Sequence, residues 1–124
     1  MYDIYQKTLA SEVIFKGIGL HSGKPSTLKL IPSKENSGIV FKRVDLEENN
    51  LINANYTNVT STKLCTTLEN SFGTKVSTVE HLLAAIYIYG IDNLIVEIDN
   101  EEVPIMDGSA KNFLQSIKPK DLMC

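Results

Sequence analysis

Glu80 and His81 are the neighbouring residues of this sequence that are best suited to chemistry, and they lie in the stretch STVEHL. A neutral imidazole can bind a metal ion, and a carboxylate beside it can take a proton from water that the metal activates. At the first turn of a helix, both side chains can converge on a point just beyond the helix end. The motifs HExxH and HxxEH are both absent: position 77 is Ser and position 84 is Ala. The pair by itself is therefore a weak indication of a metal-dependent hydrolytic site.

The same pair also has a purely structural interpretation. Ser77 followed three residues later by Glu80 is a capping-box pattern, in which each side chain accepts a hydrogen bond from the other residue's backbone N–H. His81 would then be a partly buried helix residue that donates one hydrogen bond. However, the partial positive charge of a helix N-terminus disfavours imidazolium, and a metal ion requires the neutral imidazole. The residues alone leave both interpretations open.

The element that must position this pair is a helix over residues 77–89. Apolar residues at spacings of three and four line one of its faces, and Gly90 is a typical helix end. The apolar face consists of Val79, Leu82, Leu83, Ile86 and Tyr89. A second apolar stripe predicts another helix over residues 110–117, with Asp107 or Ser109 as its N-cap.

Strands are predicted around these helices from alternating apolar and polar residues. The strand segments are 11–20, 26–31, 38–44, 63–70 and 93–99. Gly23 and Pro25 mark a turn, and the polar segment 45–58 predicts a loop or a short irregular strand. The sequence therefore predicts one domain over residues 1–124. Its fold class is α+β, a two-layer sandwich with a mostly antiparallel sheet and two helices on one face.

Composition limits the function classes. The 124 residues are 43% hydrophobic, which is enough for a real core, and their net charge is −3, with no basic stripe. Nucleic acid is therefore not expected as a partner, since binding it requires clustered cations. Cys65 and Cys124 have no metal-ligand spacing and predict free thiols in a reducing compartment. No segment is apolar enough for a signal peptide or a membrane span, so we expect a cytoplasmic protein with no membrane span.

Five ordered sequence blocks strengthen the functional interpretation of Glu80 and His81. They are GIGLHSGK (17–24), KLCTTL (63–68), VSTVEHLLAA (76–85), GIDNLIVEI (90–98) and VPIMDGSA (103–110). With these blocks the chain closely resembles the N-terminal domain of the UDP-3-O-acyl-N-acetylglucosamine deacetylases, zinc amidases of lipid A biosynthesis. The resemblance runs from about residue 5 to residue 113. It implies a zinc-dependent deacetylase whose substrate is UDP-3-O-acyl-N-acetylglucosamine.

The resemblance also implies roles for individual residues. His81 would be a zinc ligand, and Glu80 would be the general base that takes a proton during attack on the acetamide carbonyl. Leu20 and His21 would border the active site, and Leu64 and Cys65 would line the entrance for the acyl chain. Two of these residues also have a structural interpretation. His21 could be a turn histidine hydrogen-bonded to the backbone, and Cys65 could be a small buried strand residue.

The family's second domain supplies the other zinc ligands, and this chain ends at Cys124 with His21 and His81 as its only imidazoles. A catalytic zinc ion takes three protein ligands and one open position. We therefore expect the zinc site to be incomplete in this chain, which would act with a separate C-terminal domain or by self-association. The alternative is a non-catalytic binding or assembly module that retains the fold and the acyl-chain groove.

Overall fold

The computed structural model describes residues 6–61, 66–105 and 119–122. Its strands are β1 (Gln6–Leu9), β2 (Val13–Gly19), β3 (Pro25–Pro32), β4 (Ile39–Arg43), β5 (Leu51–Asn53), β6 (Val59–Ser61), β7 (Thr66–Glu69), β8 (Lys75–Ser77), β9 (Leu94–Ile98), β10 (Pro104–Ile105) and β11 (Pro119–Leu122). The 3-10 helix η1 (Tyr56–Asn58) follows β5, and the α-helix α1 (Glu80–Ile88) follows β8. The strand segments expected at 11–20, 26–31, 38–44 and 93–99 correspond to β2, β3, β4 and β9. The polar segment 45–58, expected as a loop or a short irregular strand, contains β5 and η1.

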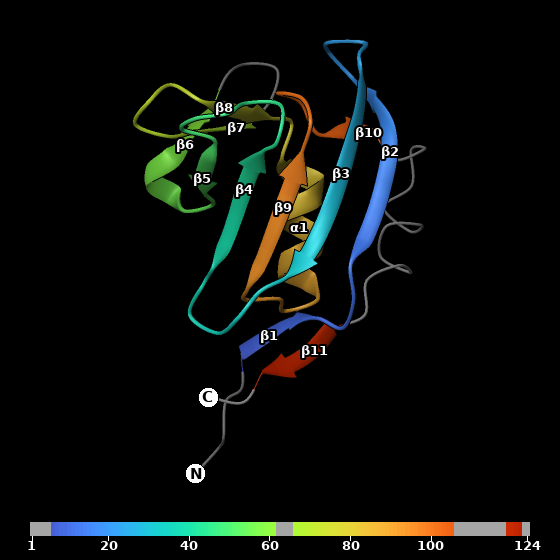
Figure 1. Cartoon of the computed structure of the whole chain (residues 1–124), viewed down its shortest axis with the longest axis vertical. Helices are drawn as coiled ribbons and strands as arrows, with labels where there is room; N and C mark the ends of the chain where they lie inside the picture. The colour runs from blue at the N-terminus through green and yellow to red at the C-terminus, as the bar shows by residue number, and fades with distance from the viewer. Residues whose placement is uncertain (1–5, 62–65, 106–118, 123–124) are drawn as a thin grey trace.

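The described strands form three sheets. The largest has six strands in the order β10-β2-β3-β9-β4-β5, the second has the order β6-β7-β8, and β1 pairs with β11. These pairs are antiparallel except for β4 and β9, which run parallel. Figure 1 shows the three-stranded sheet beside β4 and β5, which lie at one side of the large sheet. Because β1 pairs with β11, the two ends of the described chain lie side by side.

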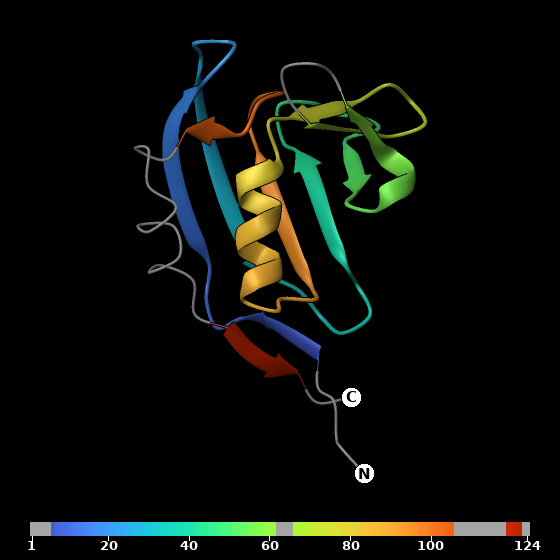
Figure 2. The same cartoon turned by 180° about the vertical axis from the view of Figure 1, so that it is seen from behind.

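Helix α1 lies against one face of the six-stranded sheet (Figure 2). In β3 and β9 every second side chain is buried, because one face of each strand packs on the core. The core residues of the large sheet include Leu28, Leu30, Phe41, Leu94, Val96 and Ile98. The expected helix face is confirmed: Val79, Leu82 and Ile86 are buried in the same core, and Leu83 and Tyr89 pack against it. A helix of nine residues is too short to be stable alone, so the burial of this apolar face is what stabilises it.

The prediction of one sheet covered by two helices is wrong. The described ranges contain one α-helix and three sheets, so the fold is α+β but not a two-helix sandwich. Gly73, with φ of +85°, closes the tight turn between β7 and β8, and the ladder hydrogen bonds of β7 go to β6 and β8 rather than to a strand of the large sheet. The second expected helix, with Asp107 and Ser109, lies outside the described residues. Among the helices that are described, none has the length and apolar character needed to span a membrane.

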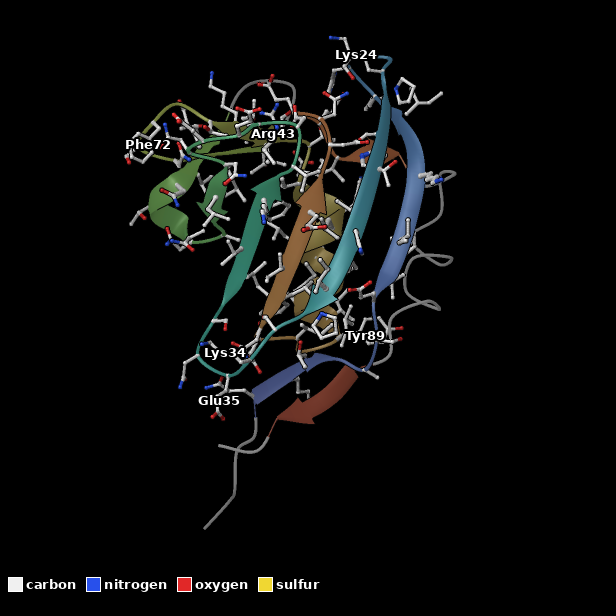
Figure 3. All side chains as sticks on the ribbon, in the orientation of Figure 1. Lys24, Lys34, Glu35, Arg43, Phe72 and Tyr89 are labelled. Atoms are coloured by element: carbon white, nitrogen blue, oxygen red, sulfur yellow. The ribbon has the colours of Figure 1, made fainter. Side chains whose placement is uncertain are left out.

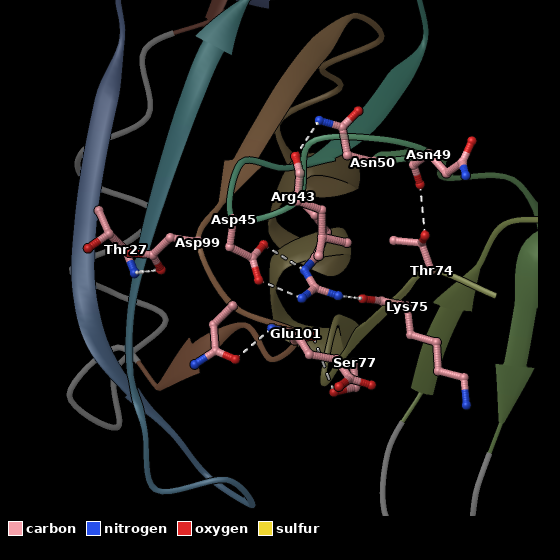
Figure 4. Close-up of polar contacts among 12 residues, drawn as sticks. Thr27, Arg43, Asp45, Asn49, Asn50, Thr74, Lys75, Ser77, Asp99 and Glu101 are labelled. Carbon is pink, nitrogen blue, oxygen red and sulfur yellow. Dashed lines mark hydrogen bonds and ion pairs between the residues drawn. The ribbon is translucent and has the colours of Figure 1, made fainter. Parts of the chain in front are cut away.

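Polar contacts attach the three-stranded sheet to the large one (Figure 4). Arg43, at the end of β4, donates a 3.0 Å hydrogen bond from Nη1 to the carbonyl of Lys75 in β8, and it also pairs with Asp45. The hydroxyl of Thr74 donates a 2.7 Å hydrogen bond to the carbonyl of Asn49. Since β8 leads into α1 after two residues, these contacts also fix where the helix begins.

Candidate active site

Glu80 is the first residue of α1, and its carboxylate is bound by backbone rather than by a capping box. Val79 is the N-cap residue and makes no side-chain capping hydrogen bond. The backbone N–H of Thr66, at the start of β7, donates to Oε1 of Glu80. The capping-box prediction is therefore wrong, because strand pairing takes the backbone groups of Ser77: its N–H donates to the carbonyl of Glu101 at 2.8 Å and its carbonyl accepts from Val103 at 3.0 Å.

The Glu80 carboxyl is held in its ionised form. Partial burial acts to raise its pKa, but hydrogen bonds from the N–H groups of Thr66 and of Glu80 itself, from the Thr66 hydroxyl, and the charge of His81 outweigh this effect. The pKa of Glu80 therefore lies below its usual value. A carboxylate that is ionised at neutral pH and only partly enclosed can accept a proton, which is what a general base must do.

His81 is the second residue of α1, and its side chain is exposed rather than partly buried. An exposed imidazole at a helix N-terminus can bind a zinc ion as one ligand of several. The described residues contain no group of three or more His, Cys, Asp or Glu side chains that could hold a metal ion. Among the described residues, His81 could therefore supply one zinc ligand but not a complete site.

Leu20 and His21 lie in the turn between β2 and β3, and both are exposed. The turn is closed by backbone hydrogen bonds from Gly19 to the carbonyl of Lys24 and from Gly23 to the carbonyl of Gly19, each at 3.0 Å. Gly23 has φ of +67°, as its place in the expected turn requires. Figure 3 shows Lys24 at the tip of this hairpin, beyond the strand ends of the large sheet. Leu64 and Cys65 lie outside the described residues.

Glu102 is a residue of this region that the sequence patterns do not reveal. It lies between β9 and β10, is 3% exposed, and accepts hydrogen bonds from the backbone N–H groups of His21 and Ser22 and from the hydroxyl of Thr78. Burial acts to raise the pKa of its carboxyl, but the hydrogen bonds from Ser22, Thr78 and His21 hold that pKa below its usual value. In sequence, Glu102 stands in the polar run DNEEV, which is typical of an exposed turn. Its partners are 24 to 81 residues away, so no local pattern could have identified it.

Gly19 leaves the space that Glu102 occupies. A Cβ atom at this position would lie 2.3 Å from Oε1 of Glu102 and 2.5 Å from Oγ of Ser22. We expect Gly19→Ala to lower the free energy of unfolding by about 1–3 kcal/mol, because both groups would have to move from their hydrogen bonds. Urea unfolding of the two proteins measures this difference. Equal unfolding midpoints would contradict the packing described here.

Comparison with known proteins adds evidence that is independent of this geometry. The family model described as "LpxC: UDP-3-O-acyl N-acetylglycosamine deacetylase" matches residues 6–123. Proteins named UDP-3-O-acyl-N-acetylglucosamine deacetylase are similar over most of the chain. The one from Wigglesworthia glossinidia brevipalpis is 49% identical over 92% of this chain, and the one from Geobacter sp. (strain M21) is 52% identical over 92%. The one from Pseudoalteromonas atlantica is 49% identical over 96%.

These matches cover only part of each relative. The chain spans 38% of the length of the Wigglesworthia protein, 37% of the Geobacter protein and 40% of the Pseudoalteromonas protein. Most of the length of each relative therefore has no counterpart in these 124 residues.

Proposed function

The chain belongs to the UDP-3-O-acyl N-acetylglycosamine deacetylase family, and from this premise we propose that it is part of a zinc-dependent amidohydrolase of lipid A biosynthesis. The substrate would be UDP-3-O-acyl-N-acetylglucosamine, from which the N-acetyl group is removed. The observation that carries this proposal is the start of α1, where Glu80 is held ionised directly before the exposed imidazole of His81. We place the activity in the cytoplasm, where thiols such as Cys65 and Cys124 stay reduced.

The surroundings of Glu80, of His81 and of the β2–β3 turn support the roles proposed for them, and the roles of Leu64 and Cys65 follow from the family resemblance alone. Glu80 would accept the proton of the attacking water, and the N–H of Thr66 would keep its carboxylate oriented during this transfer. His81 would be one zinc ligand, and a bound zinc ion supplies Lewis-acid polarisation of a carbonyl and acidifies water. Leu20 and His21, on the exposed β2–β3 turn, would contact the substrate, and Leu64 and Cys65 would contact its acyl chain.

The remaining zinc ligands would come from outside these 124 residues. The sequence holds two histidines, and the described residues hold no cluster able to complete a site around His81. On α1, Tyr87 and Ile88 are 85% and 70% exposed, which supports a partner that packs against this helix. The natural complement is the part of the family's length that this chain does not span.

The proposal is tested with the 124-residue chain and a separately produced C-terminal part of the Geobacter relative. Alone, the chain should bind zinc with a Kd of about 1–15 mM, because one imidazole supplies roughly a quarter of the 10–16 kcal/mol of a four-ligand site. It should release no acetate from the substrate. Together, the two parts should retain zinc after dialysis and release acetate.

Two outcomes of this experiment would count against the proposal. Nanomolar zinc binding and turnover by the chain alone would show that the site is complete within it. A folded, associated pair that never releases acetate would favour the alternative, a binding or assembly module without hydrolytic activity. Metal analysis of the dialysed proteins and acetate quantification distinguish these cases.

A further inference from the structure

Among the described residues, Glu102 carries a buried negative charge whose partners are N–H and hydroxyl groups. The ion pairs of Lys29 with Glu12 and of Arg43 with Asp45 do not involve Glu102, and the groups that lower the pKa of its carboxyl are hydrogen-bond donors of Ser22, Thr78 and His21. Burying a carboxylate is unfavourable unless hydrogen bonds compensate for its lost hydration. Here Oε1 accepts from the N–H groups of His21 at 3.0 Å and Ser22 at 2.9 Å, and Oε2 accepts from the Thr78 hydroxyl at 2.8 Å.

Thr78, one of these donors, has an unusual backbone conformation. Its φ is +61°, in the left-handed region that a β-branched residue rarely adopts. Such a conformation persists only where surrounding contacts hold it, and functional sites are where it is common. For Thr78 these contacts are the hydroxyl bond to Glu102 and a 2.9 Å hydrogen bond from its N–H to the carbonyl of Thr66. Two residues later the chain reaches Glu80, whose carboxylate is bound by the N–H of the same Thr66.

One carboxylate therefore joins two segments that are far apart in sequence. On one side it binds the turn that presents Leu20 and His21, and on the other it holds the bend that leads into Glu80 and His81. We propose that Glu102 is a positioning residue for the proposed deacetylation, because it sets the β2–β3 turn against the start of α1. This inference rests on the proposed function. It concerns geometry at the site, since Glu102 itself is buried and touches neither substrate nor metal in this role.

Glu102→Ala in the chain combined with its complement is the direct test. We expect kcat per folded molecule to fall about 10- to 100-fold, the range observed when supporting hydrogen bonds around a metal site are removed. Turnover is measured only under conditions in which urea titration shows the variant to be folded, so that a loss of stability is not mistaken for a loss of kcat. In NMR spectra of the chain, the amide protons of His21 and Ser22 should shift upfield and exchange faster, since they lose a charged acceptor.

Two further variants separate positioning from general support. Glu102→Gln keeps an acceptor for the N–H groups and can donate to the Thr78 hydroxyl, so it should recover most of the lost kcat. The neighbouring exposed acid provides the matched control, and Glu101→Ala should leave both kcat and the two amide signals unchanged. A kcat for Glu102→Ala equal to the wild-type value, with the wild-type assembly active, would overturn the inference.

Substitutions at Thr78 decide the question if Glu102→Ala does not fold. Thr78→Val keeps the shape but removes the donor, and Thr78→Ser keeps the donor. A lower kcat for Thr78→Val than for Thr78→Ser supports the inference, and equal kcat values for the two variants overturn it. Failure of the proposed function gives a different result, because wild type and Glu80→Gln are then equally inactive in the complemented assembly. That result also overturns the positioning role of Glu102 in deacetylation.

Discussion

Glu80→Gln is expected to lower the turnover of the complemented enzyme by about 10²- to 10⁴-fold, the contribution typical of a general base. Glutamine has nearly the same shape, and its amide oxygen can still accept the hydrogen bond from the Thr66 N–H. It cannot accept a proton from the attacking water. The chemical step should therefore fail while the start of α1 keeps its structure, and acetate release from the UDP-sugar substrate measures the loss.

The control for Glu80→Gln is the same change at an exposed carboxylate away from α1. Glu48, in the connection between β4 and β5, is exposed, and Glu48→Gln should leave turnover unchanged. Zinc content should be equal in wild type and both variants, because none of these changes removes a proposed ligand. Turnover of Glu80→Gln within about threefold of wild type would exclude Glu80 as the general base, since the expected loss begins at about 10²-fold.

His81→Ala is expected to weaken zinc binding by the complemented assembly by about two to three orders of magnitude. The estimate takes one ligand as about a quarter of the 10–16 kcal/mol that a four-ligand zinc site provides. The imidazole is exposed in the first turn of α1, so its removal should cost little stability, and the loss should come from the metal site alone. Competition with a chromophoric chelator measures the zinc affinity.

The other histidine offers a matched control for this experiment. His21 is also exposed and also belongs to a family-like block, but its proposed role is substrate contact. His21→Ala should leave zinc affinity unchanged and raise KM. If both variants lose zinc equally, His21 is a ligand as well, and if neither does, the assignment of His81 as a ligand fails.

The candidate site shows where local patterns are sufficient and where they are not. The adjacency of Glu80 and His81 makes them candidates for a site, and their place at a helix start follows from the apolar spacing that ends at Gly90. The helix ends with hydrogen bonds from Gly90 to the carbonyl of Tyr87 and from Ile91 to that of Ile86, the pattern that a left-handed glycine allows. The capping box was wrong, because Ser77 is paired in β8 before the helix begins.

By itself, the sequence determined the elements whose causes are local. Alternation and helical spacing predicted β2, β3, β4, β9 and α1, and the ordered blocks indicated the family. The tertiary structure decided the sheet order, the separation of β6, β7 and β8 from the large sheet, and the burial and hydrogen bonding of Glu102. The physical reason is that these features depend on hydrogen bonds between residues far apart in the chain. A carboxylate in a polar run is the same in sequence whether water or the N–H groups of a distant turn surround it, and only the folded chain brings those groups to Glu102.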